Sequence, residues 1–149
     1  MSGVPAPLSP RLATSADRAA IEALLLACDL PPDGVQGCLG DCLLVEQDEV
    51  LLGCAAIEVC DDAVLLRSLA VTPRARARGI AATLVDTLQE RARARGAGEL
   101  WLLTDSAADW FAARGWRTMS RETAPPGVRT HAQFLHLCPA SACLMRRAL

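Results

Sequence analysis

LAVTPRARARGIA, residues 69–81, joins an apolar run to a helical pattern through a proline turn and an arginine-rich loop. The run at 64–71 is typical of a strand, and Pro73 ends it. After Gly79, apolar residues recur at helical spacing, which predicts a long amphipathic helix. Its apolar face consists of Ile80, Leu84, Val85, Leu88 and Ala92.

The loop between this strand and this helix has the chemistry of an anion site. Backbone N–H groups at a helix start lack partners within the helix, and the helix dipole adds partial positive charge there. Such a start favours a phosphate or pyrophosphate. Arg76 and Arg78 add charge-assisted donors, and Gly79 lets the backbone approach a ligand closely. The alternative is an ordinary strand-to-helix loop in a chain whose basic side chains are all arginine.

The neighbouring segments predict an α/β fold. Apolar residues 100–103 suit a buried strand parallel to the strand before the helix, which makes a β-α-β crossover over 65–103. Three strand-like runs, 42–46, 51–59 and 64–71, are separated by short polar connections and predict an antiparallel meander. The remaining expected elements are a strand near 11–13, a helix after the capping pattern 14–17, a weak turn or helix over 33–39, a helix over 107–114 and a strand over 142–146. Residues 122–133 show no clear pattern.

Length and composition fit one domain, residues 1–149, with the proline-rich residues 1–10 as a loose N-terminal arm. The chain has no lysine, tyrosine or asparagine, which excludes a lysine Schiff base, a Walker-type phosphate loop and a tyrosine general acid. An odd number of cysteines, seven, without a Cys-x-x-Cys pair favours reduced thiols over disulfides or structural zinc.

The charge distribution favours a small anionic ligand. The chain has a net charge of −2, yet residues 67–95 carry seven arginines against Asp86 and Glu90. This contrast disfavours a nucleic-acid or membrane-surface binder and suggests a discrete anion site. Solvated helix charge is the alternative for Arg91, Arg93 and Arg95. Without an apolar run of about 20 residues or a signal-peptide pattern, a cytoplasmic location is expected.

Three motifs in register resemble the GNAT N-acetyltransferase superfamily. Arg76-x-x-Gly79-x-Ala81, after LAVTP at 69–73, is similar to the family's acetyl-coenzyme A signature. ELWLLT at 99–104 resembles its fifth strand, and WFAARGW at 110–116 resembles its FYxxxGF segment. The resemblance implies a single domain with a mixed, twisted sheet of about six or seven strands and about four helices, whose two central parallel strands splay around the cofactor.

The same resemblance implies acetyl-coenzyme A as cosubstrate and no metal. The backbone of the last strand residues before Pro73 would pair with the pantetheine arm, with an N–H near Val71 aimed at the thioester oxygen. The arginine loop would cradle the pyrophosphate. The implied cofactor-binding residues are Leu69, Ala70, Val71, Arg76, Ala77, Arg78, Gly79, Ile80, Ala81 and Phe111.

A narrower resemblance concerns the GNAT branch associated with bacterial arsenic-resistance operons. It rests on VLLRSLAV at 64–71, LLTDSA at 102–107 and CPASA at 138–142. It implies a small amino acid-like acceptor, bearing an arsenic or phosphinic group, whose α-amine is acetylated. Arg67, Ser68 and Thr104 would bind this acceptor, with Arg67 at its anionic end. The expected protein is a monomer or homodimer.

Catalysis needs a base and a route for protonating the leaving thiolate. Many family members carry a tyrosine where this chain has Phe111, so Ser106 or water would donate the proton. Glu58 is the candidate base, because partial burial in its apolar strand would raise its pKa. Alternatively, Glu58 points to solvent or pairs with Arg67 across adjacent strands, and that ion pair is also the alternative for Arg67.

Further candidates are weaker. His131 and His136 lie in a part of the chain that has no clear pattern. Cys38 with Cys42, or Cys138 with Cys143, could bind a soft ion such as trivalent arsenic, although packing is the simpler role of these thiols. The missing tyrosine and the seven cysteines therefore leave open a non-catalytic acetyl-coenzyme A or metalloid (arsenite) sensor.

Overall fold

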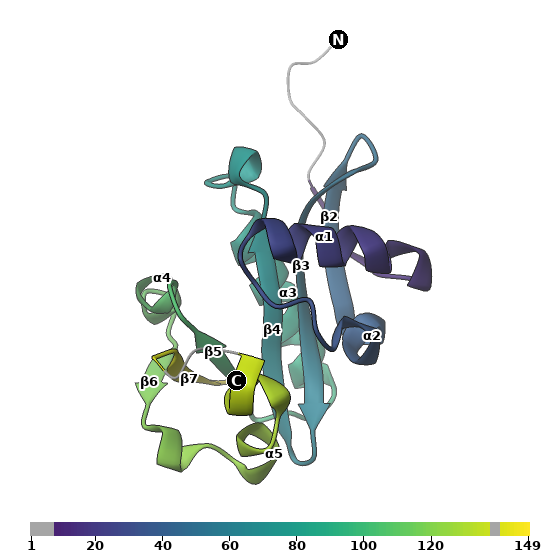
Figure 1. The fold of residues 1–149 in the computed structure, drawn as a ribbon. Coiled ribbons are helices and arrows are strands. Elements are labelled where there is room, and N and C mark those ends of the chain that lie inside the picture. The colour runs from purple at the N-terminus through teal and green to yellow at the C-terminus, as the bar shows by residue number, and fades with distance from the viewer. Residues whose placement is uncertain (1–7, 138–140) are drawn as a thin grey trace.

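The computed structural model describes residues 8–137 and 141–149. A seven-stranded sheet in the order β1-β2-β3-β4-β5-β7-β6 forms the frame (Figure 1). Neighbouring strands are antiparallel, except for the parallel pair β4 and β5. The strands are β1 (Arg11–Leu12), β2 (Cys42–Gln47), β3 (Val50–Cys60), β4 (Ala63–Val71), β5 (Glu99–Thr104), β6 (Arg117–Met119) and β7 (Cys143–Ala148). The predicted meander and β-α-β crossover are confirmed.

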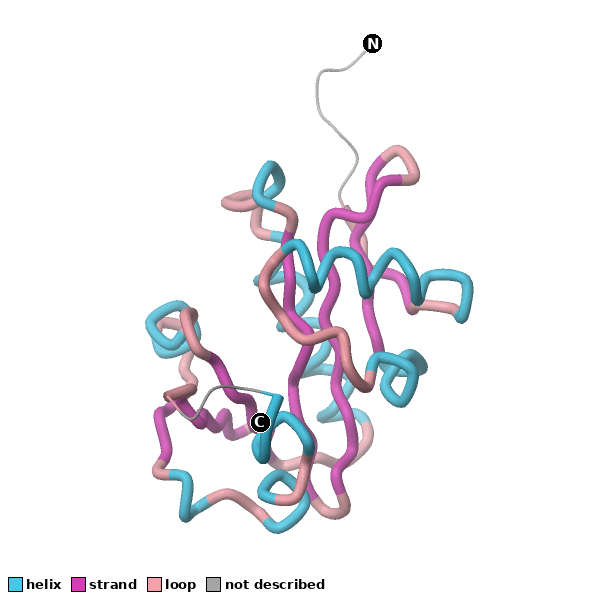
Figure 2. Tube along the Cα trace, viewed as in Figure 1, coloured by secondary structure: helices cyan, strands magenta, loops and turns pink. Residues whose placement is uncertain are grey.

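Helices cover both faces of the sheet (Figures 1 and 2). The α-helices are α1 (Arg18–Ala27), α2 (Val35–Cys38), α3 (Ile80–Ala94), α4 (Ala108–Ala112) and α5 (Pro126–Arg129). The capping box predicted at Thr14 and Asp17 is present and leads into α1 through a 3-10 turn at Ser15–Asp17. Further 3-10 turns, Leu39–Asp41 and Pro73–Ala75, precede β2 and follow β4, respectively, and a π-helical turn, Gln133–Leu137, follows α5. None of the helices in the described ranges is long and apolar enough to cross a membrane.

Alternation along the strands explains why both faces are covered. Leu43 and Val45 of β2 pack in one cluster with the apolar face of α3. Cys42 and Leu44 point to the opposite face and pack with α1 and α2. Because successive strand side chains point to opposite faces, a nearly continuous apolar run is buried only when helices cover both sides. The apolar run that predicted this strand therefore also required the two helical layers.

A bulge in β4 precedes the opening of the sheet. Cys54 of β3 pairs with Ala70, whereas Ala56 pairs with Arg67, so β4 carries one extra residue between the two pairs. Ser68 lies in this bulge with a φ of 60°, a left-handed conformation that non-glycine residues rarely adopt. The strands β4 and β5 are paired at Leu65 and Trp101 and diverge toward their carboxyl ends (Figure 1).

The structure extends the sequence prediction in two places. β6 was not predicted, and the segment without a clear pattern contains a 3-10 turn at Arg121–Thr123 as well as α5. Residues 1–7 of the predicted N-terminal arm lie outside the described residues, as does Cys138. The six described cysteines are free thiols, as the composition predicted.

Candidate functional site

A cleft of about 1110 Å³ lies where β4 and β5 diverge. Its walls are formed by the end of β4, the arginine loop (residues 74–79), the first turn of α3, the end of β5 and the residues that follow β5. The predicted site residues that line it are Arg67, Ser68, Leu69, Ala70, Val71, Arg76, Ala77, Gly79, Ile80, Ala81, Thr104, Ser106 and Phe111. Glu58 and Arg78 are not among its lining residues.

The arginine loop places the start of α3 against the cleft. Ala77 and Gly79 both have positive φ angles, 66° and 77°, and bend the chain into the helix. No heavy atom lies within 4 Å of the position that a Cβ on Gly79 would take, apart from atoms of its own chain neighbours. The Arg76 Nε donates a hydrogen bond to the Val71 oxygen at 3.1 Å and ties the loop back to β4. The result is an open helix N-terminus, a favourable place for an anion.

Arg78 points elsewhere. Its Nη2 donates to Oε1 of Gln47 at 3.3 Å, beside a separate hollow of about 180 Å³ that Arg74 also lines. The role predicted for Arg78 in cofactor binding therefore has no support from the cleft, unlike the roles predicted for its loop neighbours.

Arg67 is a buried cation at the inner end of the cleft. It is 4% exposed, and its Nη1 donates to Oε1 of Glu58 at 2.9 Å. Its Nε donates to the Ser68 hydroxyl at 3.2 Å, and its Nη2 donates to the Asp33 backbone oxygen. The cross-strand ion pair considered for Glu58 and Arg67 is thus present.

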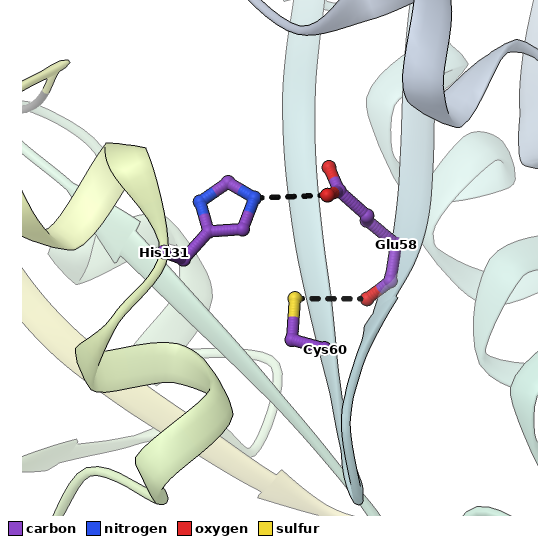
Figure 3. Close-up of side chains that lie close together, drawn as sticks. All are labelled: Glu58, Cys60 and His131. Carbon is purple, nitrogen blue, oxygen red and sulfur yellow. Dashed lines mark hydrogen bonds and ion pairs between the residues drawn. The ribbon is translucent and has the colours of Figure 1, made fainter.

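His131 holds the second oxygen of Glu58 (Figure 3). The distance from His131 Nε2 to Glu58 Oε2 is 3.1 Å. His131 Nδ1 accepts the backbone N–H of Gln133 at 3.0 Å, so in the neutral ring the proton sits on Nε2 and is donated to Glu58. This hydrogen bond, together with Arg67, lowers the pKa of Glu58 below its usual value of 4.5. The predicted rise in that pKa is wrong, because the two donors outweigh burial.

Glu58, Cys60 and His131 bring three possible metal ligands within 4.8 Å of one another (Figure 3). Their chemistry argues for a hydrogen-bonded cluster instead. The His131 nitrogen that faces Glu58 carries the proton, and the Arg67 cation already neutralises the carboxylate. Burial raises the pKa of the Cys60 thiol to about 11, whereas a metal binds the thiolate.

The other buried thiols offer little to a soft ion. Cys38 and Cys42 lie within the core cluster between α1, α2 and the sheet. Burial raises the pKa of both thiols, that of Cys42 to about 12. Because the thiolate is the ligand for trivalent arsenic, these residues behave as small packing residues.

Phe111, where the resemblance would place a tyrosine, and Ser106, a predicted proton donor, both line the cleft. Phe111 is 4% exposed and makes edge-to-face contacts with Trp110 and Trp116, at centroid distances of 4.9 and 5.4 Å. Ser106 is exposed, and its hydroxyl has no hydrogen bond within the described residues. The Thr104 hydroxyl instead accepts the backbone N–H of Ala107 at 3.0 Å.

Among the cleft-lining residues that sequence reasoning missed are Gln133 and Arg114, which both have long polar side chains. Gln133 is 6% exposed and lines the cleft. Arg114 also lines it, with its guanidinium 4.4 Å from the centroid of the Trp110 ring. No periodicity marks Gln133, since it belongs to a single π-helical turn. Arg114 sits inside the WFAARGW motif, but the motif was valued only for Phe111.

Comparisons with known proteins agree with this geometry. The profile of the acetyltransferase (GNAT) family matches residues 15–116, more than half of the chain. An amino-acid acetyltransferase of Pseudomonas fluorescens is 38% identical over 84 residues, 55% of this chain and 19% of that protein. One from Neisseria meningitidis is 33% identical over the same length. The chain thus spans about a fifth of the length of these curated relatives.

Solved structures share the fold. An N-acetylglutamate synthase from Neisseria gonorrhoeae, solved with coenzyme A and N-acetyl-glutamate, has a TM-score of 0.84 and 26% identity, covering 98% of this chain and 36% of that one. A Mycobacterium tuberculosis protein solved with coenzyme A has a TM-score of 0.78 and 21% identity, covering 94% and 98%. Family profile, fold and cleft together show that the chain belongs to the acetyltransferase (GNAT) family.

Proposed function

We propose that the protein transfers the acetyl group of acetyl-coenzyme A directly to the primary amine of a small, amino acid-like molecule. One observation carries this proposal: a single cleft joins the bulged end of β4 to the open N-terminus of α3. A cofactor with an extended amide-containing arm and a pyrophosphate needs these two features together. The amino-acid acetyltransferases among the relatives support the acceptor class.

The residues present fit coenzyme A. The backbone at residues 69–71 would pair with the extended arm, because β4 and β5 have diverged and no strand within residues 8–137 and 141–149 pairs with this part of β4 on the β5 side. The loop residues Arg76 and Gly79, with the first turn of α3, would bind the pyrophosphate. Acetyl-coenzyme A supplies a thioester carbonyl that an amine can attack.

Glu58 is the proposed proton acceptor. Its lowered pKa leaves it ionised at neutral pH but makes it a weaker base than a free carboxylate. The proton that it accepts is therefore the acidic one released once the amine nitrogen has bonded to the thioester carbon. Because Glu58 lies behind Arg67 and His131 and not on the cleft wall, we propose that this proton reaches it through a bridging water. Ser106 or water would return a proton to the thiolate, since the phenyl ring of Phe111 has none to give.

The resemblances found in the sequence support a finer proposal for the acceptor. Arg67 would bind its anionic end, with Ser68 and Thr104 nearby. The resemblance to the arsenic-resistance branch suggests that the acceptor is an amino acid that carries an arsenic or phosphinic group. We include such compounds among the proposed acceptors. The cytoplasm, where thiols stay reduced, is the proposed compartment.

Two measurements test the function. Isothermal titration should show binding of acetyl-coenzyme A and coenzyme A, and a thiol-release assay should show turnover with L-amino acids or with their arsenic- or phosphinate-bearing analogues. No binding at millimolar concentration would overturn the cofactor assignment. Binding without turnover on any amine would point to a sensor, and turnover restricted to polyamines or protein N-termini would overturn the acceptor class.

A further inference from the structure

Gln133 combines deep burial with a carboxamide that has no protein partner. It is 6% exposed and lines the cleft. Within the described residues, its side chain makes no hydrogen bond. Among the described residues, the side-chain polar atoms that lack both a hydrogen-bond partner and contact with solvent belong to Trp101, Trp116 and Arg147. The Gln133 carboxamide is not one of these, so it keeps some contact with solvent. A buried polar group normally has a partner, and a ligand in the cleft that Gln133 lines would supply one.

A short chain of contacts places Gln133 close to Arg67. The Gln133 backbone N–H donates to His131, His131 donates to Glu58, and Glu58 accepts from Arg67. The three distances are 3.0, 3.1 and 2.9 Å. Gln133 and Arg67 are therefore linked through His131 and Glu58, and both line the same cleft.

Arg67 has donors left for a ligand. A guanidinium carries five N–H groups, and three are directed to Ser68, Glu58 and the Asp33 backbone. Glu58 already neutralises the Arg67 charge, so no surplus cation remains for a doubly charged group. A neutral carboxamide beside such a guanidinium adds a donor without adding charge. This combination fits one carboxylate or an equivalent singly charged oxyanion.

We propose that Gln133 is an acceptor-binding residue, which with Arg67 binds the single carboxylate or oxyanion that the acceptor carries close to its amine. This inference rests on the function proposed above and adds its specificity determinant. The Gln133 carboxamide N–H₂ donates to one anion oxygen, and a remaining N–H of Arg67 donates to the other. An acceptor whose carboxylate is converted to a carboxamide loses the charge that this pair recognises.

The experiment compares wild type with Gln133→Leu and Gln133→Glu. Gln133→Leu keeps the volume and removes the donor, while Gln133→Glu keeps the shape and adds a repelling charge. Isothermal titration into coenzyme A-loaded protein first identifies the tightest-binding standard L-amino acid or phosphinate analogue. The acid and its amide are then compared. Gln133→Leu should weaken binding of the acid by about 10-fold, and Gln133→Glu by more, while the amide loses less.

The controls separate this inference from the proposed function. Gln36→Glu makes the same charge change on α2, at an exposed residue outside the cleft, and should leave both affinities unchanged. Affinity for coenzyme A should be equal in all variants. If the ratio of acid to amide affinity is unchanged in Gln133→Glu, or if no carboxylate or phosphinate binds wild type, the inference is wrong. Binding of the acid with this selectivity but without turnover supports the inference and overturns the proposed catalysis.

Discussion

Glu58 is held from both sides, by the Arg67 guanidinium on one oxygen and by His131 on the other. Both donors favour the ionised carboxylate. Its pKa in the folded chain is therefore lower than the value of 4.5 that it has when unfolded. The contribution of Glu58 to stability is complete above that unfolded value and is lost as the pH falls through the folded pKa.

Glu58→Gln should therefore lower the free energy of unfolding at pH 7 by about 2 kcal/mol, because it leaves Arg67 buried without its counter-ion. Urea unfolding followed by circular dichroism at pH 7 and pH 3 measures this change. The difference between variant and wild type should shrink at pH 3. The control Glu49→Gln, at an exposed turn position, should change stability little at either pH. An equal difference at both pH values would contradict the account.

Residue by residue, sequence could predict the cofactor side of the site better than the acceptor side. Arg76, Gly79 and Ala81 lie in one continuous motif, and that motif was enough to predict that they lie together at one site. The ion pair between Glu58 and Arg67, which the sequence offered only as an alternative, is present because adjacent antiparallel strands bring the two residues together. The direction of the Glu58 pKa was wrong, since the decisive donor, His131, comes from a segment distant in sequence. Gln133 was not found for the same reason.

Two glycines, one on either side of α3, allow a matched test of the role proposed for the arginine loop. Gly79 and Gly96 flank this helix, both have positive φ angles, and neither would place a Cβ within 4 Å of other atoms. Alanine at either position should cost about 1 kcal/mol of stability, from the left-handed backbone alone. Only Gly79 lines the cleft.

Gly79→Ala should consequently weaken coenzyme A binding by at least about 10-fold, because a methyl group would stand where the phosphate approaches the helix start. Gly96→Ala should bind as wild type does. Isothermal titration measures the affinities, and thermal unfolding checks that the two variants lose similar stability. Equal affinity in the two variants would remove the phosphate role from this helix.

The short helix α5 is packed against the turn between β3 and β4. A Cβ on Gly127 would lie 1.9 Å from the backbone oxygen of Cys60, which leaves no room for any side chain. Gly127→Ala should therefore lower the free energy of unfolding by about 3 kcal/mol, the upper end of overpacking effects. Gly98→Ala, where a Cβ meets nothing within 4 Å, is the control. Chemical unfolding of the two variants measures the contrast, and equal loss would contradict this packing.

Elements that the sequence predicted share a strong local pattern. α1 and α3 show apolar residues at helical spacing, and β2 to β5 are long apolar runs. β6 has only three residues, and α5 has four. Elements this short carry no periodicity, and they form because Val128 and Trp116 are buried against the rest of the molecule. Their existence is a property of tertiary packing, which one sequence does not display.

At the scale of the whole molecule, the cleft separates two parts of one sheet. The strands β1 to β4 lie on one side, and β5, β7 and β6 lie on the other. A ligand that pairs with both diverging edges would tie the two parts together. Coenzyme A at about 100 times its Kd should stabilise the fold by about 2.7 kcal/mol and raise Tm by about 5 to 10 °C.

Differential scanning fluorimetry with a coenzyme A titration measures this shift, and hydrogen exchange locates it. Protection should increase at the ends of β4 and β5, around residues 66–71 and 102–104, more than in β2. Adenosine alone, which lacks the extended arm, is the control and should not protect β5. A shift in Tm without added protection at these strand ends would place the ligand elsewhere.

The divergence of β4 and β5 also bears on how well the folded chain resists proteases. Where the strands part, the carboxyl end of β4 has no strand neighbour on the β5 side within the described residues, and an unpaired strand edge favours local opening and attack by proteases. A small metabolite would complete the sheet there. We therefore expect coenzyme A to slow cleavage of the folded chain at this edge, which limited proteolysis with and without the ligand measures.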